Sequence, residues 1–341
     1  MAKNLYFNRA DEKLSYSEHW WGARLGMLKQ AVRPLIPQRL LEVRRRRIWL
    51  RAARTAGLKL VIHDVFFDLE RENKVLRIRS SHAFYLQHII DNFDYYMDSV
   101  ISVPMDGRIL VDMSGPRYHR LRGFADIPFL FPSHIEPYRT TAEYLDFAGL
   151  GDGQVVLDIG AYSGVTSIIF AGLVGASGHV YAFEADRTNY ECALQNIEMA
   201  KRWMGLDNIT LIHKAVWSHA DGLIFSNEGA MGSSAVAITG GGRGLETKIP
   251  STTLDGFCRE QGLTRVDFIK VDIEGGEIEL LESSIDFLAR LKSKLIVEPH
   301  WVGGSMSTGR CSRLLELAGY AVRVRDKVGE SEPMIEAVMK K

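Results

Sequence analysis

Two apolar segments that each lead to a carboxylate most constrain the fold of this 341-residue chain. The first, 155–159, contains the carboxylate of Asp158 and runs into a turn between Gly160 and Gly164. The second, 180–183, ends at Glu184. A segment of helical length separates them. This order is typical of an α/β sheet whose parallel strands open a nucleoside-binding crevice at their carboxyl ends. The sequence therefore predicts that the turn approaches a cofactor and that Glu184 accepts hydrogen bonds from a ribose.

The glycine spacing of this turn disfavours a dinucleotide. A pyrophosphate fingerprint places glycines at its first, third and sixth positions, and those positions hold Gly160, Tyr162 and Val165. A cofactor without phosphate, such as S-adenosylmethionine (SAM), needs one close backbone approach and polar groups for its amino-acid end. Groups that can supply these are found at Asp158, Gly160, Ser163 and Gly164.

From residue 155 onward, predicted strands and helices alternate. The predicted strands are 155–159, 179–184, 208–213, 266–271, 294–298, 320–325 and 333–339, and the predicted helices are 164–174, 188–203, 276–284 and 309–318, preceded by a helix at 140–150. Such βαβ units predict an α/β fold with a mostly parallel sheet wrapped by helices. A glycine-rich insertion at 221–251 is either a mobile flap over the site or a hairpin with a flexible turn.

Residues 1–135 have a different pattern and are predicted to form an α+β extension for acceptor recognition or dimerisation, ahead of a catalytic domain at 136–341. Residues 1–57 are aromatic and basic and indicate one or two helices. Short strands are predicted at 58–64, 74–78, 99–103 and 107–112, followed by a basic loop at 116–122.

The arginine run 44–47 allows two interpretations. A solvated cationic helix face is the usual one. Peripheral contact of 40–54 with an anionic membrane surface is the alternative, supported by Trp20, Trp21 and Trp49.

Composition narrows the function classes. Lys and Arg together number 42, as do Asp and Glu, so no global charge calls for nucleic acid. Cys192, Cys258 and Cys311 are isolated, which indicates a reducing compartment without a disulfide framework or zinc site. Charged residues interrupt the N-terminal segment, so no signal-peptide core is recognised. A cytoplasmic protein is expected.

A second cluster of chemically active residues surrounds the predicted strand 266–271. Lys270, Asp272 and Glu274 alternate along it and should share one side near its carboxyl end. Crowded charge of this kind is costly unless it serves a site. Glu277 falls in the first turn of the next helix, where the helix dipole favours a carboxylate, and a structural role is predicted for it.

His300 follows the predicted strand 294–298 at the same sheet edge. An imidazole suits general-base catalysis because its unperturbed pKa lies near ~6.5. The alternative is a histidine that only caps the strand end through a hydrogen bond.

Taken together, these segments resemble the FkbM family of SAM-dependent methyltransferases over about residues 136–325. The resemblance rests on LDIGAYSG at 157–164, FEAD at 183–186 with Asn189 and Asn196 behind it, TTLDGF at 252–257, VDFIKVDIEGGE at 266–277 and EPH at 298–300. Where the family commonly has Phe-Glu-Pro, this chain has Phe-Glu-Ala.

The resemblance implies a class I methyltransferase fold, a Rossmann-like, mostly parallel seven-stranded sheet with helices on both faces. It also implies methylation of hydroxyls on sugars, glycolipids or secondary metabolites. The first 130 residues match nothing in the family pattern, so they leave the acceptor open.

Resemblance and position together assign roles in cofactor binding. Asp158 would order the glycine turn, and Gly160, Tyr162 and Ser163 would line the amino-acid end of SAM. Glu184 would bind the ribose. Asp186 and 214–216, with Ala215, would lie near the adenine. Thr140 and Thr141 would either reach the cofactor carboxylate or cap a helix.

The acceptor side follows in the same way. His300 or Asp272 would remove the proton of the acceptor hydroxyl, while Lys270 and Glu274 orient the acceptor or tune the base. Asp272 and Glu274, with the histidine, could instead hold a divalent cation, an arrangement ranked second.

The predicted function is SAM-dependent O-methylation of a small-molecule or glycan hydroxyl, by a protein that could form a homo-oligomer. Two alternatives stay open. One is an NAD-linked oxidoreductase or epimerase, and the other is a non-catalytic SAM-binding protein.

Overall fold

The computed structural model describes residues 38–104, 106–124, 127–136, 138–240, 244–326 and 333–340. These form two compact units, one ending at Ser114 and one beginning at Gly115. The division falls before the boundary at 135 that was expected from the sequence. Residues 115–135 join the second unit because, for example, Leu130 exchanges two backbone hydrogen bonds with the side chain of Asn196 (2.7 and 2.9 Å).

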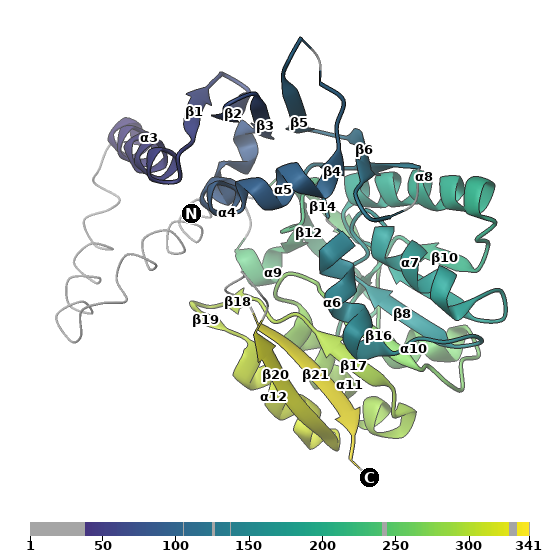
Figure 1. Cartoon of the computed structure of the whole chain (residues 1–341). Coiled ribbons are helices and arrows are strands. Elements are labelled where there is room, and N and C mark those ends of the chain that lie inside the picture. Colours follow the sequence, from purple (N-terminus) through teal and green to yellow (C-terminus); the bar gives the residue numbers. More distant parts are fainter. Residues whose placement is uncertain are drawn as a thin grey trace, which may run out of the picture. The chain divides into compact units, whose positions relative to one another are not determined.

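The described part of the first unit is an α+β unit. A four-stranded sheet has the order β1-β2-β3-β5, in which β3 and β5 are parallel and the other pairs antiparallel. The elements are α3 (Gln38–Thr55), β1 (Lys59–Ile62), β2 (Phe66–Arg71), β3 (Lys74–Arg79), η3 (Ser80–Tyr85), α4 (Leu86–Asp91), α5 (Phe93–Ser99), β4 (Val100–Ile101) and β5 (Ile109–Met113) (Figure 1). The sequence does not predict α4 and α5, because helices this short show no helical periodicity.

Helix α3 carries the arginine run. Arg44, Arg46 and Arg47 are exposed, as expected for a cationic helix face. Trp49 packs edge-on against Phe67 of β2, with ring centroids 5.7 Å apart. Trp49 is therefore part of the packing of this unit, whereas Trp20 and Trp21 lie outside the described residues. Membrane contact through 40–54 stays a prediction.

The second unit is built on a seven-stranded sheet with the order β10-β9-β8-β16-β17-β21-β20 (Figure 1). The strands are β8 (Val155–Ile159), β9 (His179–Phe183), β10 (Ile209–Ile212), β16 (Phe268–Val271), β17 (Lys294–Val297), β20 (Tyr320–Asp326) and β21 (Pro333–Met339). β21 is antiparallel to β17 and to β20, and the other neighbouring strands are parallel. This is the class I methyltransferase sheet that the sequence predicts.

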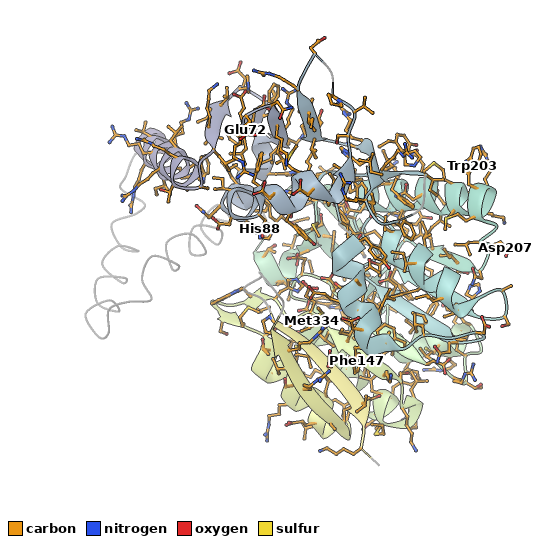
Figure 2. The ribbon with its side chains drawn as sticks, viewed as in Figure 1. Glu72, His88, Phe147, Trp203, Asp207 and Met334 are labelled. Carbon is orange, nitrogen blue, oxygen red and sulfur yellow. The ribbon has the colours of Figure 1, made fainter. Side chains whose placement is uncertain are left out.

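Helices cover both faces of this sheet, and alternate strand residues point to opposite layers. Leu157 and Ile269 pack into a core with α10 (Leu254–Glu260), α11 (Glu277–Leu291) and α12 (Thr308–Leu317). Val156 and Phe268 pack on the other face with α6 (Tyr138–Ala148) and α7 (Val165–Val174). Phe147 and Met334 belong to this second layer (Figure 2). Asp158 and Lys270 therefore face α6 and α7, because they follow Val156 and Phe268 by two residues.

Another helix of this unit, α8 (Arg187–Met204), follows β9. It is one residue longer at each end than the predicted helix 188–203, and the residue that follows it, Gly205, has a φ of +70°. Trp203 in its last turn is 70% exposed (Figure 2). No helix within the described ranges is long and apolar enough to cross a membrane.

Two segments differ from the sequence prediction or complete it. The predicted basic loop at 116–122 is wrong, because β6 (Arg117–Leu121) pairs antiparallel with β7 (Pro128–Phe131). Only its last residue, Leu121, is buried, so the strand lacks an alternating apolar pattern. The insertion forms an antiparallel sheet of β13 (Ser234–Ala235), β12 (Leu223–Asn227) and β14 (Leu245–Ile249), with the short α9 (Val236–Thr239).

That inserted sheet has its own apolar cluster, formed by Trp217, Leu223, Phe225, Ala235 and Ile249. The antiparallel strands of the insertion therefore agree with the hairpin alternative. The glycine tip at 241–243 lies outside the described residues, and a flap over the site stays a prediction.

Candidate active site

The glycine turn after β8 requires glycine at its first position. Gly160 has a φ of +90°, and a Cβ added there would lie 1.8 Å from the carbonyl oxygen of Asp272. Its N–H and that of Ala161 both donate to the carbonyl of Phe183, at 3.0 and 2.8 Å. The turn is therefore hydrogen-bonded to the end of β9 and lies close to Asp272, the residue that follows β16.

Glu184 lies at the end of β9 beside this turn. Its Oε2 accepts the N–H of Tyr162 at 2.7 Å, and its Oε1 accepts the N–H of Asp186 at 2.8 Å. Burial raises the pKa of Glu184 to about 8, and the negative charge of Asp186 adds to the effect. Each carboxylate oxygen keeps a further acceptor position, since it has two lone pairs.

Asp186 is fully buried and caps α8. Its Oδ1 accepts the N–H groups of Thr188 and Asn189 at 2.8 and 3.1 Å. Its Oδ2 accepts from the N–H of Gly229 at 3.0 Å and the hydroxyl of Ser233 at 2.7 Å. The structure thus places Asp186 between the helix and the insertion, with four donors on one carboxylate.

A buried ion pair lies under the turn. The register of β8 and β16 sets Asp158 opposite Lys270, and Lys270 Nζ lies 3.3 Å from Asp158 Oδ1. The same ammonium donates to the carbonyl of Gly160 at 2.6 Å and lies 3.4 Å from Asp272 Oδ2. Burial lowers the pKa of Lys270, but Asp158 and Asp272 raise it more, so it stays above its usual value. Asp158 has no exposed surface and also accepts from Ser167 at 2.5 Å.

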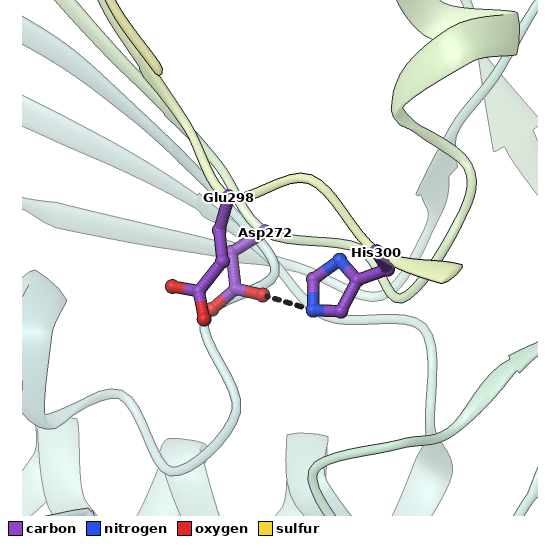
Figure 3. A group of neighbouring side chains, drawn as sticks. All are labelled: Asp272, Glu298 and His300. Carbon is purple, nitrogen blue, oxygen red and sulfur yellow. Dashed lines mark ion pairs between the residues drawn. The ribbon is translucent and has the colours of Figure 1, made fainter. Parts of the chain in front are cut away.

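Acidic side chains and one histidine meet at the carboxyl ends of β16 and β17 (Figure 3). His300 Nε2 lies 3.6 Å from Asp272 Oδ1 and 3.6 Å from Glu274 Oε1. Glu298 accepts from the hydroxyl of Tyr144 at 2.8 Å. The structure therefore brings Asp272, Glu274 and His300 together, as the sequence predicts. Glu274 reaches the group through a turn with a φ of +53° rather than through strand alternation, because β16 ends at Val271.

Glu277 holds His300 from behind. Its fully buried Oε1 lies 2.8 Å from His300 Nδ1 and accepts the N–H of Gly275 at 3.0 Å. Burial lowers the pKa of His300, but Glu274 and Glu277 raise it more, so it lies well above its usual value. The ring orientation is thus fixed, with Nε2 directed at Asp272 (Figure 3).

Comparison with known protein families identifies the family of the domain that holds these residues. Residues 158–322 match the model of the methyltransferase FkbM domain. This chain contains an FkbM methyltransferase domain. The matched segment includes the glycine turn, Glu184, the Asp158 and Lys270 pair and the acidic cluster with His300.

Individual relatives are distant. Over 72 residues the chain is 39% identical to a protein-L-isoaspartate O-methyltransferase of Methanothermobacter thermautotrophicus, and the match covers 21% of this chain and 30% of that protein. An FkbM methyltransferase structure from Methylobacillus flagellatus aligns with a TM-score of 0.42 and 14% identity, covering 75% of this chain and 55% of the other. An O-methyltransferase from Bacillus cereus, solved with S-adenosylhomocysteine, aligns with a TM-score of 0.37 and 17% identity, covering 60% and 82%.

The other predicted cofactor residues differ in position and in burial. Tyr162, with a φ of +50°, donates its hydroxyl to the carbonyl of His134 at 2.7 Å. Thr141 lies inside α6, not at its start, and its hydroxyl contacts that of Thr166 at 2.8 Å. Ala215 lies in a short strand, β11 (Ala215–Val216), that pairs with β15 (Ser251–Thr252). The side chain of Thr140 lies outside the described residues.

Sequence reasoning missed Glu136 and Tyr144. Glu136 accepts from Ser163 at 3.1 Å and from Thr166 at 2.7 Å, and burial raises its pKa to about 7. No motif marks it, because it precedes α6 in a segment without periodicity. Tyr144 could have been suspected only as a polar aromatic on the apolar face of a helix that leads into the nucleoside pattern.

Replacing Glu136 by glutamine is expected to alter the pH dependence of stability. In the folded protein Glu136 keeps its proton to about pH 7, with Lys270 and Asp158 as its charged neighbours, whereas an unperturbed carboxyl loses it near 4.5. The free energy of unfolding therefore contains a contribution of ~3 kcal/mol from the protonated Glu136 side chain. This contribution is fully present below pH 4.5 and is lost as the pH rises through 7. Denaturation of cofactor-free protein measures the free energy of unfolding at pH 5 and at pH 8. The decrease between the two pH values should be smaller in Glu136→Gln than in wild type. A loss equal to that of wild type, with exposed Glu198→Gln as control, would contradict the burial effect.

Proposed function

We propose that this protein transfers the methyl group of SAM to a hydroxyl oxygen of a small molecule or glycan. The observation that carries the proposal is the FkbM domain match, whose residues place a glycine turn and Glu184 beside an acidic cluster with a histidine. The glycine turn and Glu184 suit a nucleoside cofactor without phosphate. The acidic cluster with its histidine suits an acceptor that must lose a proton. The relative that is 39% identical over 72 residues is an O-methyltransferase, which supports oxygen as the methylated atom.

The cofactor would lie across the carboxyl ends of β8 and β9. Glu184 would accept both ribose hydroxyls while keeping its two backbone donors. The turn at Gly160 would lie against the amino-acid end, and the carboxyl of Glu136, next to Ser163, would accept a hydrogen bond from the α-ammonium group. Asp158 and Lys270 would act from beneath the turn, by holding the carbonyl of Gly160 in place.

The reaction needs alignment and one proton acceptor. The acceptor oxygen attacks the methyl carbon in line, the electron pair of the sulfur–carbon bond returns to sulfur, and S-adenosylhomocysteine leaves. The hydroxyl proton would pass to Asp272, which is the more accessible of the two candidate bases, with a side chain 26% exposed against 5% for His300. Positioning could supply ~7–11 kcal/mol, and the base a factor of about 10²–10⁴.

The NAD-linked alternative has less support. Tyr162 occupies the place of the second fingerprint glycine, and its hydroxyl is fixed on the carbonyl of His134. This leaves no glycine where a pyrophosphate would approach the backbone.

Calorimetric titration with SAM, S-adenosylhomocysteine and NAD tests the cofactor assignment. We expect micromolar binding of the first two and none of NAD. Binding of NAD alone would overturn the proposal. A panel of sugars, glycolipids and polyols, assayed by release of S-adenosylhomocysteine, then tests the acceptor class, and saturating SAM binding without turnover on amines or hydroxyls would favour the non-catalytic alternative.

A further inference from the structure

We propose that Asp272, Glu298 and His300 form a binding site for a divalent transition-metal cation. One ligand atom from each residue, two carboxylate oxygens and one imidazole nitrogen, lies within 4.8 Å of the other two. Ligands bound about 2.1 Å from a metal lie ~3–4 Å from each other, so a small inward shift of the side chains closes the site. Figure 3 shows the three side chains converging from the ends of two neighbouring strands.

The backing of His300 is a second observation that points to a metal. A metal-binding imidazole usually donates its other N–H to a carboxylate, which fixes the ring and the tautomer. Glu277 supplies that acceptor at 2.8 Å from Nδ1, and the N–H of Gly275 holds Glu277 in place. Nε2 is the nitrogen left for a cation, and it is the one directed at Asp272.

The charge of the surroundings favours a cation as well. Five carboxylates gather here, those of Asp158, Asp272, Glu274, Glu277 and Glu298. Ion pairs join Lys270 to Asp158 and Asp272, and His300 to Asp272, Glu274 and Glu277. Lys270 shares its single charge between Asp158 and Asp272. A divalent ion would offset the repulsion that remains among the carboxylates.

The ligand set indicates which ion and which substrate. One imidazole with two carboxylates suits Mn²⁺, Fe²⁺ or Zn²⁺ better than Ca²⁺, which prefers oxygen ligands throughout. Three protein ligands leave coordination positions open. Resting on the proposed function, we infer that two neighbouring oxygens of the acceptor, such as a vicinal diol, occupy them, and that the cation makes one hydroxyl easier to deprotonate.

Manganese binding tests the site without any assay of activity. Chelator-treated full-length protein is titrated with Mn²⁺, and free Mn²⁺ is followed by electron paramagnetic resonance. We expect one site, weakened at least 100-fold in His300→Ala and about 10- to 100-fold in Glu277→Gln, where only the backing of the ring changes. The control Glu282→Gln removes an exposed carboxylate of α11 and should bind as wild type does.

Two results would overturn the site. One is that wild type shows no saturable binding of Mn²⁺ or Zn²⁺, and the other is that His300→Ala binds as tightly as wild type. Tyr144→Phe replaces no ligand but removes the hydroxyl that donates to Glu298 at 2.8 Å and lies 3.5 Å from Asp272, so it provides a second variant if His300→Ala does not fold. It should weaken binding several-fold, and unchanged affinity would count against these two carboxylates. Titration of SAM in chelator separates the two proposals: SAM binding without Mn²⁺ binding removes only the cation site, and the reverse removes the methyltransferase proposal.

Discussion

Replacing Gly160 by alanine is expected to lower the free energy of unfolding by at least ~3 kcal/mol, or to prevent folding. The new Cβ would lie 1.8 Å from the carbonyl oxygen of Asp272, and a backbone atom cannot rotate away as a side chain can. The φ of +90° adds strain for any residue with a Cβ. Urea denaturation followed by circular dichroism measures the loss.

Gly172 offers a matched control within the same strand–turn–helix segment. It lies inside α7, is exposed, and an added Cβ would meet nothing within 4 Å. Alanine there should stabilise the protein by ~0.5–1 kcal/mol, because it favours helix more than glycine does. If both variants changed stability alike, the close approach of the turn to Asp272 would be wrong.

Replacing Glu184 by alanine is expected to weaken binding of SAM and of S-adenosylhomocysteine by at least about 100-fold. Two hydrogen bonds to a carboxylate contribute ~1.5–3 kcal/mol each, and a tenfold change in affinity corresponds to ~1.4 kcal/mol. The variant also frees the N–H groups of Tyr162 and Asp186, which loosens the turn. Calorimetric titration gives the affinity, and a melting curve shows whether the variant is folded.

Glu191→Ala is the control for this experiment. Glu191 lies on the exposed side of α8 and pairs with Arg187 one turn away. Its replacement removes a carboxyl group at a surface position and should leave cofactor affinity unchanged. Equal affinities in wild type and Glu184→Ala would remove Glu184 from the cofactor site.

The fold of the second unit could largely be predicted from the sequence, because its strands are short apolar runs flanked by glycine turns and helices. Strands 155–159 and 333–339 match the structure at both ends. The failures have local causes. β6 exposes most of its side chains, and α4 and α5 are each shorter than two helical turns, so neither strand nor helix periodicity can develop.

The site was harder to predict because its geometry depends on turns and on pairs distant in the chain. Alternation along the strand correctly joins Lys270 to Asp272, but it gives no sign that Lys270 would lie against the carbonyl of Gly160. Glu136 and Tyr144 arrive from outside the motifs, and only the packing of α6 on the sheet brings Tyr144 to Glu298.

The ammonium of Lys270 has a consequence for how the acceptor of the proposed reaction could change. One buried charge contacts the carbonyl of Gly160 and the carboxylate of Asp272, so under the proposed function both sides of the reaction would share a single support. A substitution that reshapes the acceptor side at Asp272 would also disturb the cofactor side. New acceptor specificity would therefore arise more easily from residues that do not contact Lys270.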